Sequence, residues 1–269
     1  MAGQTAPPVA AQARLAGPVA LLVADGGRPA LRNFVLPVLA VAAVAWTLTA
    51  RTGSGDMTMG AATFIASWVV MMVAMMLPAV APVVGLYALA ARRNVVAAVP
   101  VFLAGYLLVW ALSALPAYAV AQQVSDPLAM GRPWVARLTG ATLLAAAAYQ
   151  FTPLKAACLA HCRSPMSFFL GRSGSLAKPR AAFAAGSAHG LYCLGCCWAL
   201  MAVLVVLGGM QIGWALGLAA VIALEKLGPW GLTASRAVAA GAAGLGIALI
   251  ASPQLLTHLI TVQQMSMSM

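Results

Sequence analysis

Long apolar runs dominate this sequence, and they constrain the fold more than any other feature. A helix needs roughly 20 predominantly apolar residues to cross the ~30 Å hydrocarbon core of a membrane. Of the 269 residues, 63% are hydrophobic and only 7% are charged, whereas a soluble domain has about 25% charged residues. The sequence therefore predicts an all-α fold, a polytopic membrane helical bundle of about seven transmembrane helices.

The predicted spans define the domain organisation. They are residues 34–50, 61–90, 95–121, 137–158, 181–208, 211–227 and 236–251. The run at 211–227 is short, so six spans are the alternative. We expect a loosely ordered cytoplasmic leader at 1–33, a transmembrane helical domain at 34–258 and a Met/Ser-rich tail at 259–269, with the tail extended.

The lysines and arginines predict how the bundle is oriented. With seven spans, eleven of them fall on the side of the N-terminus and only Arg51, Arg132 and Arg137 on the other, with Lys155 near a span end. Because basic residues concentrate in cytoplasmic loops, we expect a cytoplasmic N-terminus and a multi-pass protein of the bacterial inner membrane. This topology and contact with the anionic lipid bilayer account for the net charge of +11, so no nucleic-acid partner is expected.

The cysteines and two of the three histidines form two clusters at helical spacing. The clusters are Cys158, His161 and Cys162, and then His189, Cys193, Cys196 and Cys197. Each set lies largely on one helical face, and Met201 extends the second stripe. Gly186 and Gly190 should allow another helix to approach closely beside His189.

Methionines add a third type of soft ligand. Met71, Met72, Met75 and Met76 form two i, i+4 pairs in the second predicted helix. Further methionines are expected outside, at Met57 and Met59 and in the tail at Met265, Met267 and Met269. Thiolate and imidazole suit Cu(I), zinc and iron–sulfur clusters, and thioether favours Cu(I) among them. We therefore expect a copper site, with zinc or iron as alternatives.

Each of these patterns also has a plain interpretation. A methionine stripe at helical spacing is usually packing, and cysteine is a small residue that packs well. Cys193 and Cys196 have the spacing of a thiol–disulfide pair. A cysteine about 12 residues into a span is roughly 18 Å deep, which favours a buried metal. His258 stands alone near the end of the last helix and is given no role.

Two buried charges need partners. Lys155 and Glu225 both lie near the predicted cytoplasmic face, so they can pair. The alternative is that Lys155 extends to the headgroups and Glu225 merely ends its helix. Glu225 is also the one carboxylate available as a metal ligand or proton carrier.

The sequence resembles the bacterial predicted metal-binding integral membrane proteins, a family classified as a domain of unknown function. The matching stretches are 68–78 (WVVMMVAMMLP), 149–163 (YQFTPLKAACLAHCR), 190–198 (GLYCLGCCW) and Glu225-Lys226. The resemblance covers roughly residues 35–250 and implies metal binding in a membrane protein.

These observations predict a membrane protein that transports, stores or delivers Cu(I), with a copper chaperone or a cuproenzyme as partner. A membrane oxidoreductase using the same thiols or metal is the alternative, and a structural partner that binds no metal is a second alternative. Straight antiparallel helices would separate Cys158 from Cys193 by about 15 Å, which predicts two metal sites. A break of the fourth helix at Pro153 would allow a single site instead.

Overall fold

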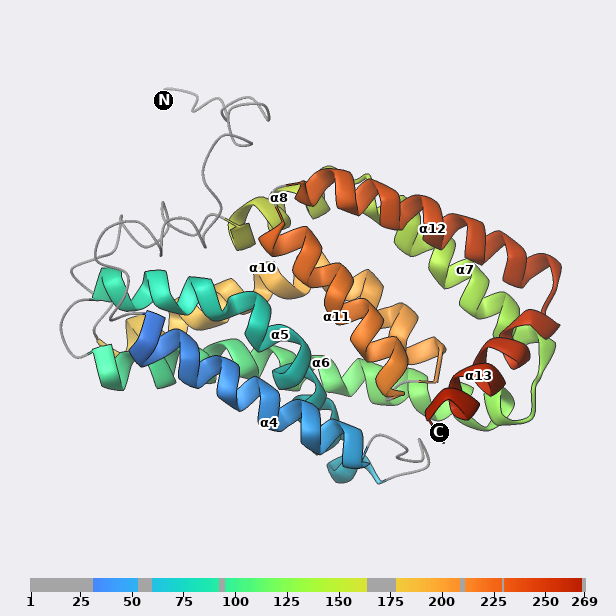
Figure 1. The fold of residues 1–269 in the computed structure, drawn as a ribbon, viewed down its shortest axis with the longest axis horizontal. Coiled ribbons are helices and arrows are strands. Elements are labelled where there is room, and N and C mark those ends of the chain that lie inside the picture. The colour runs from blue at the N-terminus through green and yellow to red at the C-terminus, as the bar shows by residue number, and fades with distance from the viewer. Residues whose placement is uncertain are drawn as a thin grey trace.

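The structure is a computed structural model that describes residues 31–52, 60–91, 95–163, 178–208, 211–228 and 230–267. Every regular element within these residues is a helix, so the all-α class is confirmed (Figure 1). In chain order the helices are η1 (Leu31–Val35), a short π-helix, then α4 (Leu36–Thr52), α5 (Ala61–Ala91), α6 (Val95–Ala129), α7 (Pro133–Gln150), α8 (Pro153–Arg163), α10 (Pro179–Val206), α11 (Ile212–Leu227), α12 (Gly231–Ala251) and α13 (Gln254–Met267).

Five helical segments are long and apolar enough to cross a membrane. They are Arg32–Arg51, Ala61–Ala91, Val95–Ala129, Pro179–Val206 and Thr233–Ala251. The number rises to six if the bent pair of α7 and α8 forms one span. Helix α11 is apolar but has only 16 residues, and it is the run on which the choice between six and seven spans depended. Seven spans and a cytoplasmic N-terminus stay predictions.

The predicted fourth span, 137–158, is wrong as a continuous helix. Helix α7 ends at Gln150, and α8 begins at Pro153 with a bend of 68°. Proline has no N–H to donate and its ring clashes with the preceding turn, so it fits the first position of a new helix rather than the interior of an old one. The Thr152 hydroxyl accepts a hydrogen bond from the Lys155 backbone N–H at 3.2 Å, as a residue preceding a helix does.

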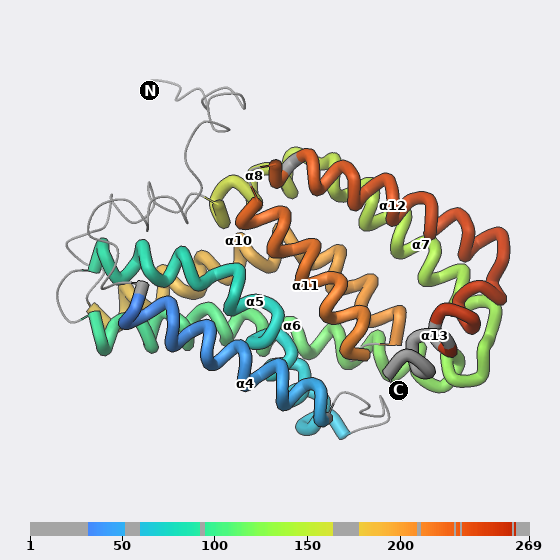
Figure 2. The backbone as a smooth tube through the Cα atoms, in the orientation of Figure 1, coloured from blue at the N-terminus to red at the C-terminus, as the bar shows by residue number. Residues whose placement is uncertain are grey.

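Buried apolar side chains form two clusters that divide the bundle. The larger cluster joins α4, α5, α6, α8, α10 and α11. The smaller joins α7, α12 and α13 to one side of α10, and Figure 2 shows these three helices together at one end of the molecule. Helix α10 contributes to both clusters, so it is the central element of the fold.

Two pairs of helices approach closely at glycines. On α10, a Cβ at Gly186 would collide with the Phe102 carbonyl of α6, and one at Gly190 would lie 3.1 Å from the Tyr106 carbonyl oxygen. The predicted close approach of another helix beside His189 is therefore confirmed, and that helix is α6. Gly140 of α7 and Gly246 of α12 face each other in the same way. Small residues let backbones meet without intervening side chains.

Parts of the predicted leader and tail lie outside the described residues. Residues 1–30 of the leader and the outer methionines Met57 and Met59 are not described. Helix α13 runs through the predicted boundary at residue 258 and ends at Met267. This part of the tail is thus helical, in contrast to the extended conformation expected from alternating Met and Ser. Met269 lies outside the described residues.

Candidate metal centre

Helices α8 and α10 bring thiols from both predicted clusters into contact. The sulfurs of Cys162 on α8 and Cys196 on α10 lie 3.7 Å apart, and the Cys196 and Cys197 sulfurs lie 3.3 Å apart. Cys193 lies within interaction range of all three. All four side chains are at most 5% exposed. We call Cys162, Cys193, Cys196 and Cys197 the sulfur cluster.

The expected separation of the two cysteine clusters by about 15 Å is wrong for Cys162 and Cys196, whose sulfurs touch. The physical reason is the break at Pro153. A straight fourth helix would carry Cys162 away along the helix axis, whereas the 68° bend lays α8 against α10 (Figure 1). The break on which a single site depended is present, and whether the thiols form one metal site or two stays a prediction.

The bend divides the first predicted cluster. Cys162 enters the sulfur cluster, while Cys158 packs against the backbone of α10 at Gly195, where an added Cβ would lie 2.7 Å from its sulfur. His161 is exposed: its ring stacks on Tyr192, with centroids 4.3 Å apart. His161 Nδ1 donates to the Ala157 carbonyl oxygen at 2.9 Å. Cys158 and His161 therefore lie beside the sulfur cluster rather than within it.

His189 is buried on α10 one turn before Cys193, and the methionines are buried in the apolar cluster that includes the thiols. The His189 ring packs against Phe102 and Tyr106, with centroid distances of 6.2 and 6.0 Å. Four methionines of α5 are at most 2% exposed and share one apolar cluster with Met201 and the thiols. These four are Met71, Met72, Met75 and Met76. The structure thus gathers sulfur from three helices into one apolar interior.

A lysine and a tyrosine that the sequence analysis did not assign to the site contact Cys193. Lys226 Nζ on α11 donates to the Cys193 sulfur at 2.9 Å, and Tyr106 Oη on α6 lies 3.0 Å from the same atom. Lys226 stands in one of the stretches that carry the family resemblance, and it is a charge inside an apolar helix. Those two features could have identified Lys226 from the sequence. Tyr106 offers no comparable signal, because only the fold shows which residue of α6 meets Cys193.

Lys155 and Glu225 form a buried ion pair, as one of the two sequence interpretations predicted. Lys155 Nζ lies 2.6 Å from Glu225 Oε2, and both side chains are 1% exposed. The other carboxylate oxygen accepts hydrogen bonds from Gln150 Nε2 at 3.0 Å and Ser235 Oγ at 2.9 Å. We call Gln150, Lys155, Glu225 and Ser235 the polar network. The interpretation in which Lys155 extends to the headgroups is wrong.

The polar network is joined to the sulfur cluster through the backbone. Lys155 Nζ also donates to the Cys196 carbonyl oxygen at 2.6 Å. Arg163, at the end of α8, donates to the Glu225 carbonyl oxygen at 2.6 Å. These bonds fix α8, α10 and α11 relative to one another at the level of the thiols. The network therefore positions the helices whose thiols form the cluster.

The thiols in this arrangement touch one another instead of surrounding an open position. Among the described residues, no three His, Cys, Asp or Glu side chains are placed around a common point where a metal ion would fit. The donor set nevertheless suits a soft ion, since four thiols lie together in an apolar interior. Binding an ion there requires the cysteine side chains to turn toward it.

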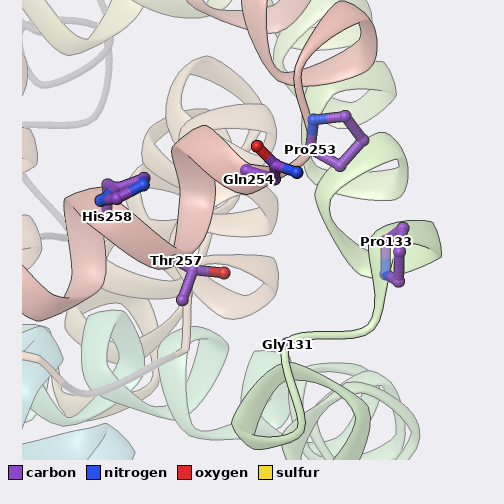
Figure 3. Close-up of a pocket in the computed structure, with 6 residues that line it drawn as sticks. All are labelled: Gly131, Pro133, Pro253, Gln254, Thr257 and His258. Atoms are coloured by element: carbon purple, nitrogen blue, oxygen red, sulfur yellow. The ribbon is translucent and has the colours of Figure 1, made fainter.

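A surface hollow elsewhere in the molecule does not resemble a metal site. It has a volume of about 280 Å³ and lies where the turn between α6 and α7 meets α13 (Figure 3). Its lining includes His258 and Thr257 but no thiol or carboxylate. One imidazole is too few ligands for a metal site.

The fold and the site define an all-helical protein with buried thiols that could bind a soft metal. A sequence model of the PpoB2 family, described as copper chaperone, matches residues 65–249. This match covers more than half of the chain, so the protein belongs to that family. The sulfur cluster and the polar network lie within the matched residues. Comparisons with curated proteins and with solved structures found no match.

Proposed function

We propose that this protein is an integral membrane copper chaperone that binds Cu(I) at the sulfur cluster and delivers it to a partner. The 3.7 Å contact between the Cys162 and Cys196 sulfurs carries the proposal. Two sulfurs bound to one ion through bonds of about 2.3 Å lie about 3.8 Å apart at a tetrahedral angle and about 4.6 Å apart when the ion is two-coordinate and linear, so the observed contact needs a shift of less than about 1 Å to reach either geometry. Two helices thus already hold a pair of thiols close to the spacing that a shared ion needs.

The chemistry of the donors favours Cu(I) over harder ions. The cluster offers thiols and neighbouring thioethers, which are soft ligands. Glu225, the one carboxylate in a described helix near the thiols, is engaged by Lys155, Gln150 and Ser235. It is therefore poorly placed to supply the oxygen that Mg²⁺ or Ca²⁺ requires. The family description supports copper, and zinc and iron are the alternatives that an analysis of bound metal must exclude.

The buried methionines supply a second, weaker set of ligands. Met71, Met72, Met75 and Met76 on α5 share an apolar cluster with Met201 and the thiols. Thioethers bind Cu(I) without charge, so they suit a temporary position on a path rather than a final one. In this proposal the outer Met57 and Met59, with the methionines of the tail, collect Cu(I) and the α5 stripe relays it to the sulfur cluster.

The apolar helices support a lipid bilayer as the location of this activity. Five or six segments have the length and composition of membrane spans. The positive-inside bias supports a bacterial inner membrane with the N-terminus in the cytoplasm. A cuproenzyme or a second copper chaperone then receives the ion.

Metal analysis of the intact protein tests the proposal. The protein is purified anaerobically in detergent, loaded with Cu(I), desalted and analysed for copper, zinc and iron. We expect stoichiometric copper in the wild type and none in the double variant Cys193→Ser/Cys196→Ser, with both proteins inserted and monodisperse. Equal copper in the double variant would exclude the sulfur cluster as the site.

A membrane oxidoreductase is the second candidate, because thiols of different helices touch at Cys162 and Cys196 and could exchange with a disulfide. Turnover with a quinol or thiol donor, without net copper transfer, favours this candidate. Copper transfer from the loaded protein to an acceptor, without turnover, favours the chaperone. A protein that carries no metal and catalyses no turnover would instead be a structural partner.

A further inference from the structure

We propose that Lys226 is the permanent counter-ion of the copper site, so that Cu(I) is held as a dithiolate that includes Cys193 and is neutralised by the Lys226 ammonium. This inference rests on the proposed function and adds the charge and number of the ligands. Its basis is the environment of one buried lysine that has no carboxylate partner in the described part of the chain.

Lys226 is buried and directed at sulfur. Its side chain is 5% exposed, and Nζ donates to the Cys193 sulfur at 2.9 Å. The hydroxyl oxygen of Tyr106 lies 3.0 Å from that sulfur as well. The Cys196 thiol, in contrast, donates its own hydrogen to the Cys193 carbonyl oxygen at 3.1 Å. Cys193 is thus the sulfur placed to carry negative charge, and Lys226 is the group that balances it.

The carboxylate of Glu225 does not pair with Lys226. Glu225 precedes it in the sequence, and successive residues of a helix point about 100° apart. Both carboxylate oxygens of Glu225 face Lys155, Gln150 and Ser235. Lys155–Glu225 is the one ion pair found between the described side chains. The charge of Lys226 therefore depends on the sulfur cluster for its partner.

The charges in the site then determine how many thiolates bind the Cu(I) ion. A buried charge at membrane depth is costly unless it is paired. Cu(I) with two thiolates carries one negative charge, and the Lys226 ammonium makes the assembly neutral. A third thiolate would leave one uncompensated negative charge. The neutral assembly is thus one Cu(I), two thiolates and Lys226, with the other thiols of the cluster in reserve for transfer.

Two substitutions of Lys226 test the counter-ion. Lys226→Gln removes the charge at similar length, and Lys226→Arg retains it. Lys178→Gln, an exposed lysine at the start of the same helix as Cys193, is the matched control. Cu(I) affinity is measured anaerobically in detergent by competition with a chromogenic Cu(I) chelator. We expect Cu(I) binding weakened by about 150-fold or more for Lys226→Gln, as for the removal of one partner of a buried charge pair, and affinities near wild type for the other two.

The outcomes separate this inference from the proposed function. Unchanged or tighter Cu(I) binding by Lys226→Gln would overturn the counter-ion. If Lys226 only stabilises the fold, its loss lowers thermal stability without weakening Cu(I) binding. If Lys226 competes with Cu(I) for the Cys193 sulfur, its loss makes binding tighter. X-ray absorption of the loaded wild type provides a measurement that does not depend on the variants folding. Two thiolate sulfurs per copper are expected, and three or four thiolate sulfurs would overturn the dithiolate. A wild type that binds no copper would overturn the proposed function itself.

Discussion

The polar network and the sulfur cluster lie side by side in the interior, yet they differ in the group that pairs with their buried lysine. In the network, the Lys155 ammonium meets the Glu225 carboxylate, and neighbouring amide and hydroxyl groups satisfy the remaining carboxylate oxygen. In the cluster, Lys226 donates to the Cys193 sulfur, which the Tyr106 hydroxyl also contacts, and no described carboxylate pairs with Lys226. Consecutive residues of α11 supply one charge to each region. The network pairs its lysine with a carboxylate, whereas the cluster pairs its lysine with a sulfur that the proposal above assigns to the bound ion.

This difference assigns separate roles to the two regions. A fully paired buried network stabilises one arrangement of its helices. Lys155 extends that arrangement to the thiols through the Cys196 carbonyl. Damage to the network should therefore affect both stability and copper binding. Damage to the cluster should affect copper binding while leaving the fold largely unchanged.

The largest effect is expected when the network loses its carboxylate. Glu225→Gln leaves the buried Lys155 ammonium without a counter-ion, which costs about 3–5 kcal/mol of stability. Thermal unfolding in detergent measures the loss, and Cu(I) affinity should fall with it. The control is Lys155→Met/Glu225→Leu, which removes both charges and should restore most of the stability. A Glu225→Gln protein that unfolds at the wild-type temperature would show that the network is not the fully paired, stabilising region described above.

Removal of single thiols from α8 sharpens the boundary of the cluster. Cys162→Ser removes the sulfur that contacts Cys196, and we expect Cu(I) binding about tenfold weaker, equivalent to about 1.4 kcal/mol. Cys158→Ser removes a thiol from the same helix that packs on Gly195 instead, so its affinity should stay near that of the wild type. Chelator competition measures both variants. A larger loss for Cys158→Ser would show that the contact geometry does not identify the ligands.

Much of this arrangement could be predicted from the sequence because it depends on local chemistry. Composition gave the all-helical class, and the spacing of Gly186 and Gly190 gave the close approach of another helix. The pairing of Lys155 with Glu225 followed from the need of buried charges for partners. Pro153 identified the point at which the fourth helix could break, although a continuous span was expected. These inferences need only the covalent properties of the residues and the period of a helix.

The composition of the cluster could not be predicted in the same way. Proline fixes where a helix breaks, but tertiary packing decides in which direction the new helix runs. The side on which α8 lies determined that Cys162 joins Cys196 while His161 stays exposed. Likewise, Tyr106 meets Cys193 only because α6 is the helix that crosses α10 there. Helical phase placed His189, Cys193 and Cys196 on one face, but it could not identify which helices pack against that face.

A smaller effect is expected at the contact between α8 and α10. In Gly195→Ala, the new methyl group would lie 2.7 Å from the Cys158 sulfur, so one of them must move. We expect a loss of about 1 kcal/mol, at the low end for overpacking, because Cys158 can rotate. If α8 moves instead, the Cys162–Cys196 contact lengthens and Cu(I) binding weakens. The Cu(I) affinity of Gly195→Ala/Cys158→Ala distinguishes rotation of Cys158 from movement of α8. The second substitution removes the clashing sulfur, so it should restore binding only if α8 had moved.

The smallest effect is expected for Ser235→Ala, and it tests how complete the polar network is. The Ser235 hydroxyl donates to Glu225 Oε1, which also accepts a hydrogen bond from Gln150 while the other oxygen pairs with Lys155. Removing the hydroxyl leaves both Glu225 oxygens paired and takes from Gln150 Oε1 only a longer contact of 3.3 Å, so the loss of stability should be about 0.5 kcal/mol. Thermal unfolding of Ser235→Ala in detergent measures this loss, and the loss for Glu225→Gln under the same conditions is the value for comparison. A loss as large as that of Glu225→Gln would mean that the carboxylate depends on every donor around it. The network would then be as finely balanced as the sulfur cluster, and the contrast between the two regions would disappear.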